Sequence, residues 1–233
     1  MTETPAAARG PDILYHDDSL VVCVKPAGLL SERGGLPELL EAQCGGRIWP
    51  VHRLDKEVGG VMVYARDRET AAALSAAIAE RRVEKEYLAV VEGRPEAESA
   101  ELRDLLYHDA ARSKSYVVKR ERKGVRQAAL RYRLLSSAET EQGPLSLLRI
   151  RLLTGRSHQI RVQFASRKLP LCGDARYGSR RRGEGVALWA AALIFPDPAD
   201  GRERRFEAPP PETVPWTLFS LHNNKPEEGE AWT

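Results

Sequence analysis

The sequence of 233 residues has little cysteine, few aromatic residues and no long apolar run. Its three cysteines, Cys23, Cys44 and Cys172, form no CxxC pair and show no metal-ligand spacing, which argues against a disulfide framework and favours a reducing, cytoplasmic environment. No segment approaches the roughly 20 consecutive apolar residues that a membrane-spanning helix needs. Residues 1–11 lack the apolar core of a secretory signal, so no signal peptide is predicted.

Charge is nearly balanced overall, with a formal net charge of +3, but it is unevenly distributed. The basic segment, residues 112–133, begins and ends with arginine and contains a single acidic residue, Glu121. Its other cations are Lys114, Lys119, Arg120, Arg122, Lys123, Arg126 and Arg131. A second basic cluster consists of Arg176, Arg180, Arg181 and Arg182. Such runs suit a polyanion, because each neutralised phosphate releases a counterion, although a solvated basic face would look the same.

Strands dominate the expected secondary structure. Two strands flank a tight turn at Asp17-Asp18, and two more, at 113–120 and 128–136, are expected to be joined through a basic turn at 122–124. Further strands are expected at 61–66, 84–93, 145–153, 187–195 and 203–209. Helices are expected at 36–44, at 69–82 behind an Asp67 cap, and at 158–168 behind a Ser157 cap.

Because the strands outnumber the helices and do not alternate with them, the pattern predicts an α+β fold with a mixed, largely antiparallel sheet and flanking helices. We expect one catalytic domain over residues 12–222, a flexible lead at 1–11 and a flexible tail at 223–233.

Two segments carry residues that could perform chemistry. In the loop 50–60, Asp55 follows a histidine and an arginine, so its carboxylate could be an acid, a base or a nucleophile, or it could merely cap a turn. Near the start of the helix at 158–168, basic and polar side chains crowd a helix N-terminus, where a phosphate or a carboxylate could dock. They are Arg156, His158, Gln159 and Arg161. No metal site is predicted, because no histidine or carboxylate pair has metal-ligand spacing.

These segments also resemble a known family. PVHRLDKEVGGVMVYARD (50–67) resembles the catalytic loop of the RluA-like RNA pseudouridine synthases, and LLTGRSHQIRVQFASRKLPLCGDARYGS (152–179) resembles that family's basic motif. VVCVKPAGLL (21–30) and EKEYLAVVEG (84–93) are similar to its early strand and its tyrosine motif. The four motifs agree in order and spacing over roughly residues 12 to 210. The resemblance implies a pseudouridine synthase fold with a central catalytic cleft.

The resemblance assigns roles residue by residue. It implies that Asp55 is the catalytic nucleophile, that Tyr87 packs on the target base and helps to remove its proton, and that Arg161 pairs with the aspartate. Arg53 matches the arginine that helps to hold the flipped nucleotide. The remaining expected RNA contacts are Arg156, His158, Gln159, Lys119, Arg120, Arg122 and Lys123. His158 and Gln159 could equally shape their turn.

The implied reaction is site-specific isomerisation of uridine to pseudouridine in structured RNA, either ribosomal or transfer RNA. It detaches uracil, rotates it and rejoins it without redox change, so no cofactor is expected, and we expect a monomer. An alternative is an RNA-binding or RNA-folding protein that keeps the fold without catalysis. A third possibility is a hydrolase that uses Asp55 and releases free uracil.

The sequence departs from the family pattern in three places. The family's Ser/Thr-Gly after the catalytic loop is replaced by Val58-Gly59-Gly60, and Trp189 stands where the family often has histidine. Because the first expected strand begins near residue 12, we also expect no N-terminal S4 domain in this chain. None of these departures touches the four residues with assigned roles.

Overall fold

The computed structural model describes residues 10–181 and 185–220. Most of the predicted N-terminal lead, Arg182 of the second basic cluster and the predicted tail lie outside the described residues. Within the described ranges, no helix is long and apolar enough to cross a membrane. The chain divides into two compact units, which are Met1–Glu84 with Ala190–Pro209 (unit 1) and Lys85–Trp189 with Pro210–Thr233 (unit 2).

Unit 1 is built on antiparallel strands. β1 pairs with β2, β2 and β3 both pair with β4, and β10 pairs with β11. These strands are β1 (Asp12–His16), β2 (Leu20–Lys25), β3 (Trp49–Pro50), β4 (Gly59–Ala65), β10 (Leu188–Pro196) and β11 (Glu203–Glu207). Every residue of β4 is buried, which fits its apolar sequence and its place inside the sheet.

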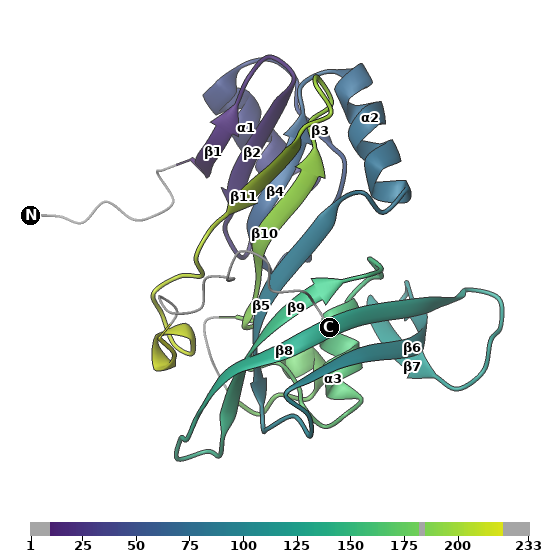
Figure 1. Cartoon of the computed structure of the whole chain (residues 1–233), viewed down its shortest axis with the longest axis vertical. Helices are drawn as coiled ribbons and strands as arrows, with labels where there is room; N and C mark the ends of the chain where they lie inside the picture. Colours follow the sequence, from purple (N-terminus) through teal and green to yellow (C-terminus); the bar gives the residue numbers. More distant parts are fainter. Residues whose placement is uncertain (1–9, 182–184, 221–233) are drawn as a thin grey trace, which may run out of the picture. The chain divides into compact units, whose positions relative to one another are not determined.

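Two helices complete unit 1, α1 (Leu36–Cys44) and α2 (Arg68–Ala79), and α2 packs beside β4 (Figure 1). The predicted cap of α2 is confirmed, because the Asp67 carboxylate accepts a hydrogen bond of 2.7 Å from the Thr70 amide. The predicted turn between the first two strands is confirmed as well. There, one carboxylate oxygen of Asp17 accepts hydrogen bonds from the amides of Ser19 and Leu20 at 2.8 and 2.9 Å.

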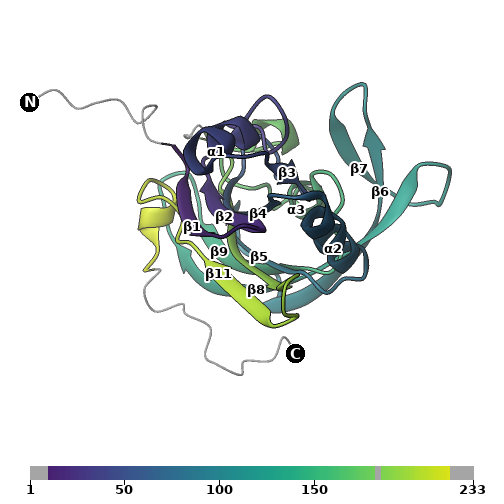
Figure 2. The ribbon, with the colours of Figure 1, turned by 90° about the horizontal axis from the view of Figure 1, so that it is seen from above.

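Unit 2 contains a sheet with the strand order β5-β9-β8-β6-β7, and every neighbouring pair is antiparallel. Its strands are β5 (Glu84–Glu92), β6 (Ser99–Asp109), β7 (Lys114–Val118), β8 (Val125–Ala138) and β9 (Leu145–Leu152). The helix α3 (Gln159–Ala165) packs on one face of this sheet, where the rings of Phe164 and Tyr132 lie 5.4 Å apart (Figure 2). Short 3-10 helices follow at Ala175–Tyr177 (η2) and Trp216–Leu218 (η3).

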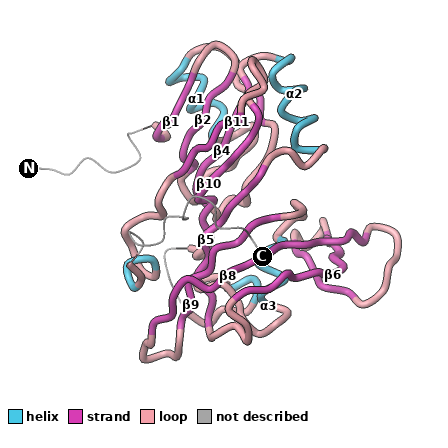
Figure 3. The backbone as a smooth tube through the Cα atoms, in the orientation of Figure 1, coloured by secondary structure: helices cyan, strands magenta, loops and turns pink. Residues whose placement is uncertain are grey.

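Strand therefore dominates the described chain, as Figure 3 shows by colour, and the predicted α+β class with a largely antiparallel sheet is confirmed. Two strands were missed, the two-residue strand β3 and the long strand β6. β6 was not predicted, because Glu101, Arg103 and Asp104 interrupt its apolar pattern. The two strands expected on either side of the basic turn at 122–124 are present as β7 and β8, but they pair on opposite sides of β6 and not with each other.

The third helix also differs from its prediction. Ser157 does not cap it. The N-cap is His158, which has a left-handed backbone with φ of 54° and makes no side-chain capping bond. The Ser157 carbonyl instead accepts a hydrogen bond of 2.6 Å from the Ser115 hydroxyl. The helix is also shorter than the expected 158–168 and ends at Ala165, before another left-handed residue, Lys168 (φ 62°). The predicted loop 50–60 is shorter too, because Pro50 joins β3 and the glycines at 59 and 60 begin β4.

Candidate active site

Asp55 lies half-buried on the loop 51–58 of unit 1, and the backbone is held on both sides of it. The Ser31 hydroxyl donates to the Leu54 carbonyl at 3.0 Å and accepts from the Leu54 amide at 3.2 Å. The ammonium group of Lys25 donates to the Lys56 carbonyl at 3.2 Å. The loop then closes on itself, since the Asp55 carbonyl accepts from the Val58 amide at 3.0 Å. The backbone position of the candidate nucleophile is therefore fixed by its neighbours.

Lys25 and Ser31 were missed by sequence reasoning. Lys25 ends β2 and is fully buried, and its ammonium also donates to the carbonyls of Pro26 and Leu29 at 3.0 and 2.7 Å. The Ser31 carbonyl accepts a bond of 2.8 Å from the buried Tyr64 hydroxyl, which anchors this segment to β4. The motif at 21–30 predicts a strand and a loop but assigns neither residue a role. A lysine at the end of an otherwise apolar strand was the signal that could have identified Lys25.

Burial lowers the pKa of Lys25 to about 8, although the nearby charges of Glu57 and Asp55 act to raise it. The ordinary value is 10.5, so the folded protein binds fewer protons than the unfolded chain between about pH 8 and pH 10.5. The contribution of Lys25 to the free energy of unfolding should therefore rise over this range, by at most about 3 kcal/mol. In urea unfolding at pH 7 and pH 10, we expect wild type to be more stable relative to Lys25→Met at pH 10 than at pH 7. A difference that does not change with pH would contradict this.

Two other loop residues have distinct environments. Arg53 is exposed, and its ion pair with Glu32 is long, at 3.7 Å, with both side chains more than half exposed. Such a pair contributes little to stability. His52 accepts a hydrogen bond of 3.2 Å from the Val63 amide through its Nε2 atom, which ties the loop to β4.

In unit 2, Tyr87 lies on β5 opposite Ile150 and is buried, and Arg161 lies in the first turn of α3 with a side chain that is only 2% exposed. Arg161 makes a two-bond ion pair with Asp174, in which Nε and Nη2 reach the two carboxylate oxygens at 2.7 and 2.9 Å. Its guanidinium carbon also lies 5.3 Å from the ring centroid of Tyr177. Sequence reasoning missed both Asp174 and Tyr177, although both stand in the GDARYGS stretch at the end of the basic motif.

The turn before α3 is built around Gln159. Its side-chain oxygen accepts hydrogen bonds from the Arg156 amide at 3.0 Å and the Thr154 hydroxyl at 2.8 Å, and its nitrogen donates to the Ala129 carbonyl at 3.0 Å. His158 Nδ1 lies 2.8 Å from the Tyr177 hydroxyl, so this side chain is held by η2. Both residues therefore have local roles, and their RNA contacts stay predictions.

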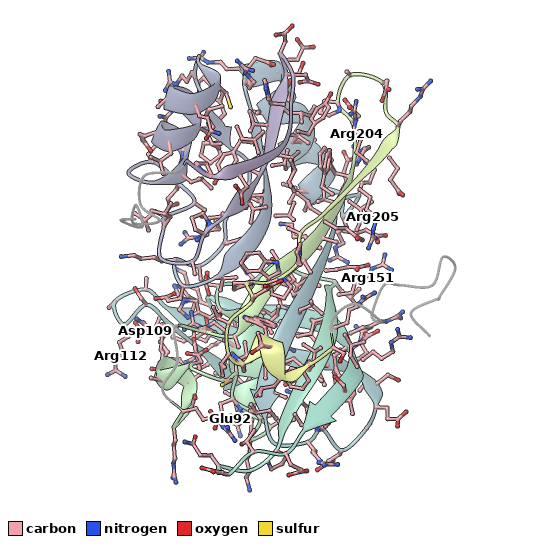
Figure 4. All side chains as sticks on the ribbon, turned by 90° about the vertical axis from the view of Figure 1, so that its left-hand side faces the viewer. Glu92, Asp109, Arg112, Arg151, Arg204 and Arg205 are labelled. Carbon is pink, nitrogen blue, oxygen red and sulfur yellow. The ribbon has the colours of Figure 1, made fainter. Side chains whose placement is uncertain are left out.

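The basic segment has an exposed part and a neutralised part. The loop between β7 and β8 exposes its four predicted RNA-contact residues, Lys119, Arg120, Arg122 and Lys123. By contrast, Arg131 pairs with Glu101 at 2.9 Å, and Arg112 lies 3.7 Å from Asp109 beside the β6–β7 turn, where Figure 4 shows the two side by side. Positive charge is thus concentrated in the loop. Among the described residues, no group of three or more histidine, cysteine or acidic side chains is arranged to hold a metal ion.

Comparison with known proteins identifies the family. Residues 19–166, more than half of the chain, match the family model described as RNA pseudouridylate synthase. The chain is 34% identical over 257 positions to ribosomal large subunit pseudouridine synthase D of Xanthomonas campestris pv. campestris, covering 98% of this chain and 75% of the relative. It is 32% identical over 234 positions to ribosomal large subunit pseudouridine synthase C of Escherichia coli K12, covering 93% and 72%.

The fold agrees with this assignment. The structure of human RNA pseudouridylate synthase domain containing 1 superposes with a TM-score of 0.78 over 90% of this chain and 87% of that chain, at 22% identity. The predicted pseudouridine synthase fold is thereby confirmed. The resemblance seen in the four sequence motifs is confirmed as well by the family match and the two bacterial relatives. The chain therefore belongs to the family of RNA pseudouridylate synthases, isomerases that act on uridine in RNA.

Proposed function

We propose that this protein converts specific uridines to pseudouridine in large-subunit ribosomal RNA, with Asp55 as the nucleophile. The substrate class is supported by the names of its relatives from Xanthomonas campestris and Escherichia coli, which are both ribosomal large subunit pseudouridine synthases. The nucleophile is supported above all by the loop geometry, in which Ser31 and Lys25 hold the backbone at Leu54 and Lys56, the residues on either side of Asp55 in the sequence. Transfer RNA is the second candidate substrate, carried over from the family resemblance.

The proposed chemistry needs a uridine that has left its stack, because a paired base cannot reach an aspartate on a protein loop. The ionised Asp55 attacks C6 of the base or C1′ of the ribose, and the bond between N1 and C1′ breaks. The uracil rotates, C5 bonds to C1′, the C5 proton leaves, and N1 takes up a proton. The bond between Asp55 and C6 or C1′ breaks in the course of these steps, which returns the free carboxylate. No electrons are gained or lost overall, which is why we propose that no cofactor takes part.

Each remaining residue has a proposed task in this sequence. Arg161 pairs with Asp55 and favours its ionised, nucleophilic form, because an opposite charge stabilises a carboxylate. Tyr87 offers its ring to the flipped base and relays the C5 proton. Arg53 exchanges its weak pairing with Glu32 for the displaced nucleotide. A central cleft holding these residues, a monomeric state and a cytoplasmic location belong to the same proposal.

The exposed cations of the β7–β8 loop are the proposed RNA surface. Reversing three of them together, as Lys119→Glu, Arg120→Glu and Arg122→Glu, should weaken RNA binding at least about tenfold at 0.1 M salt. It should also reduce the slope of log K against log salt concentration by about two, because fewer counterions are released. Filter binding across a salt series measures both. Arg120→Glu is also measured by itself, and Arg202→Glu, which reverses an exposed cation at the β10–β11 turn, is its control. Unchanged binding by the triple variant would place the RNA surface elsewhere.

The function itself is tested with purified protein and two transcripts, a large-subunit ribosomal RNA and a set of transfer RNAs. We expect pseudouridine at one or a few positions of the ribosomal transcript, detected by carbodiimide labelling and primer extension, and no free uracil. Release of free uracil would make the protein a hydrolase. Tight binding of both transcripts without any product would favour the non-catalytic alternative.

A further inference from the structure

The ion pair between Arg161 and Asp174 is deeply buried, with side-chain exposures of 2% and 0%. Removing two charges from water is expensive, and a buried pair is only weak evidence for stability. Two well-packed apolar side chains would fill the same space at lower cost. A charged pair at this position therefore calls for a role beyond packing.

Asp174 is itself rigidly placed. Its carbonyl accepts hydrogen bonds from the amides of Tyr177 and Ser179, both at 3.0 Å, and its amide donates to the Leu171 carbonyl at 3.0 Å. The turn begins at Gly173, which has a φ of 79° and approaches the Gly185 backbone so closely that a Cβ would lie 3.0 Å from its carbonyl carbon. The carboxylate thus belongs to a turn with little freedom to move.

The two bonds from Asp174 fix the orientation of the Arg161 guanidinium. A planar guanidinium bound through Nε and Nη2 can neither rotate nor slide along its partner, because both bonds would break. The Tyr177 ring beneath it is fixed as well, since the Tyr177 hydroxyl accepts a hydrogen bond of 2.8 Å from the Ser115 amide. With the Nε and Nη2 edge occupied, a second carboxylate must approach from the side of Nη1.

We propose that Asp174 is a positioning residue that fixes the orientation of the Arg161 guanidinium, the group that pairs with the catalytic aspartate in the proposed function. This inference rests on the proposed function, in which Asp55 is the nucleophile paired with Arg161. Asp174 touches neither substrate nor reacting atoms and acts through Arg161 alone. The Asp174 carboxylate also neutralises part of the positive charge of Arg161. Arg161 therefore keeps the nucleophile ionised but binds it less tightly than an arginine with no second carboxylate would.

The decisive test is a double-mutant cycle of Asp174→Asn and Arg161→Lys, measured under single-turnover and steady-state conditions. We expect Asp174→Asn to lower kcat by about 30- to 100-fold, because a displacement near 1 Å of a catalytic group costs that much, while KM for RNA changes less than about threefold. In the Arg161→Lys background, Asp174→Asn should lower kcat by less than about threefold further, because its route of action has been removed. Asp104→Asn, which breaks the ion pair with Arg167 in the same unit, is the matched control and should leave kcat unchanged.

A purely structural Asp174 gives a different result. Then Asp174→Asn would lower the melting temperature, while the single-turnover rate of the folded enzyme well below that temperature would stay within threefold of wild type. Effects of the two substitutions that multiply in the double variant would also overturn the proposal. If Asp174→Asn does not fold, Asp174→Glu keeps the charge but extends the side chain by one methylene. A loss of kcat at constant KM then supports the proposal, and a wild-type kcat contradicts it.

Failure of this inference and failure of the proposed function can be told apart. If the Asp55→Ala variant were active, Asp55 would not be the nucleophile, and both the proposed function and the role of Asp174 would fail. If Asp55→Ala were inactive while the separate variant Asp174→Asn had normal activity, only the role of Asp174 would be overturned.

Discussion

Replacing Asp55 by alanine should abolish turnover, with a single-turnover rate at least about four orders of magnitude below that of the wild-type enzyme. The substitution removes the only group proposed to form the covalent bond. It should leave the loop in place, because the bonds from Ser31 and Lys25 reach backbone atoms of Leu54 and Lys56 and do not depend on the Asp55 side chain. RNA affinity should therefore stay within a few-fold, measured by filter binding on the same preparation.

The neighbouring acid provides a matched control. Glu57 is an exposed carboxylate on the same loop, and Glu57→Gln removes one negative charge two residues from the nucleophile. We expect its single-turnover rate to lie within about threefold of wild type. If Asp55→Ala kept more than about a tenth of wild-type activity, or if Glu57→Gln were the inactive variant, the assignment of the nucleophile would be wrong.

Gly60→Ala should be the most destabilising small substitution near the site. Gly60 has a φ of 122°, and a Cβ there would lie 2.5 Å from the Ala190 amide nitrogen and 2.7 Å from its carbonyl carbon. Because both obstacles are backbone atoms of the adjacent strand β10, no side-chain rotation can relieve the clash. We expect the free energy of unfolding to fall by at least about 3 kcal/mol in urea titrations.

Gly143→Ala separates the clash from backbone strain. Gly143 has a comparable φ of 98°, but a Cβ added there would meet no atom within 4 Å. Its substitution should cost only about 1 kcal/mol, which is the strain of a left-handed alanine. Equal losses for the two variants would show that strain alone, and not the approach of β4 to β10, explains the need for glycine at position 60.

Most of the fold could be predicted from local patterns. The apolar runs of β2, β4 and β5 and the Asp67 cap of α2 are signals carried by consecutive residues, and the structure confirms them. β6 lacked such a signal, because its charged residues find their partners on other strands, as Glu101 does with Arg131. The register of β6 between β7 and β8 depends on contacts far apart in the sequence, which no local pattern contains.

The candidate site likewise contains residues that local motifs predict and residues that only contacts far apart in the sequence reveal. The sequence motifs predicted roles for Asp55, Tyr87 and Arg161, and the basic and polar residues at the helix N-terminus predicted a site for a phosphate or a carboxylate. The structure adds Asp174, which lies 13 positions further along and meets the guanidinium only because the chain turns back after α3. Ser31 and Lys25 were missed for a similar reason, since their partners at Leu54 and Lys56 lie on the other side of α1 in the sequence.

The most direct test of the central claim is a pseudouridine map of total RNA from cells that lack this protein, complemented with either the wild type or Asp55→Ala. We predict that one or a few sites in large-subunit ribosomal RNA lose pseudouridine and that only the wild type restores them. Restoration by Asp55→Ala would contradict the role of Asp55. Identical maps with and without the protein, together with no product on transcribed RNA in vitro, would contradict the claim that this chain is an active synthase.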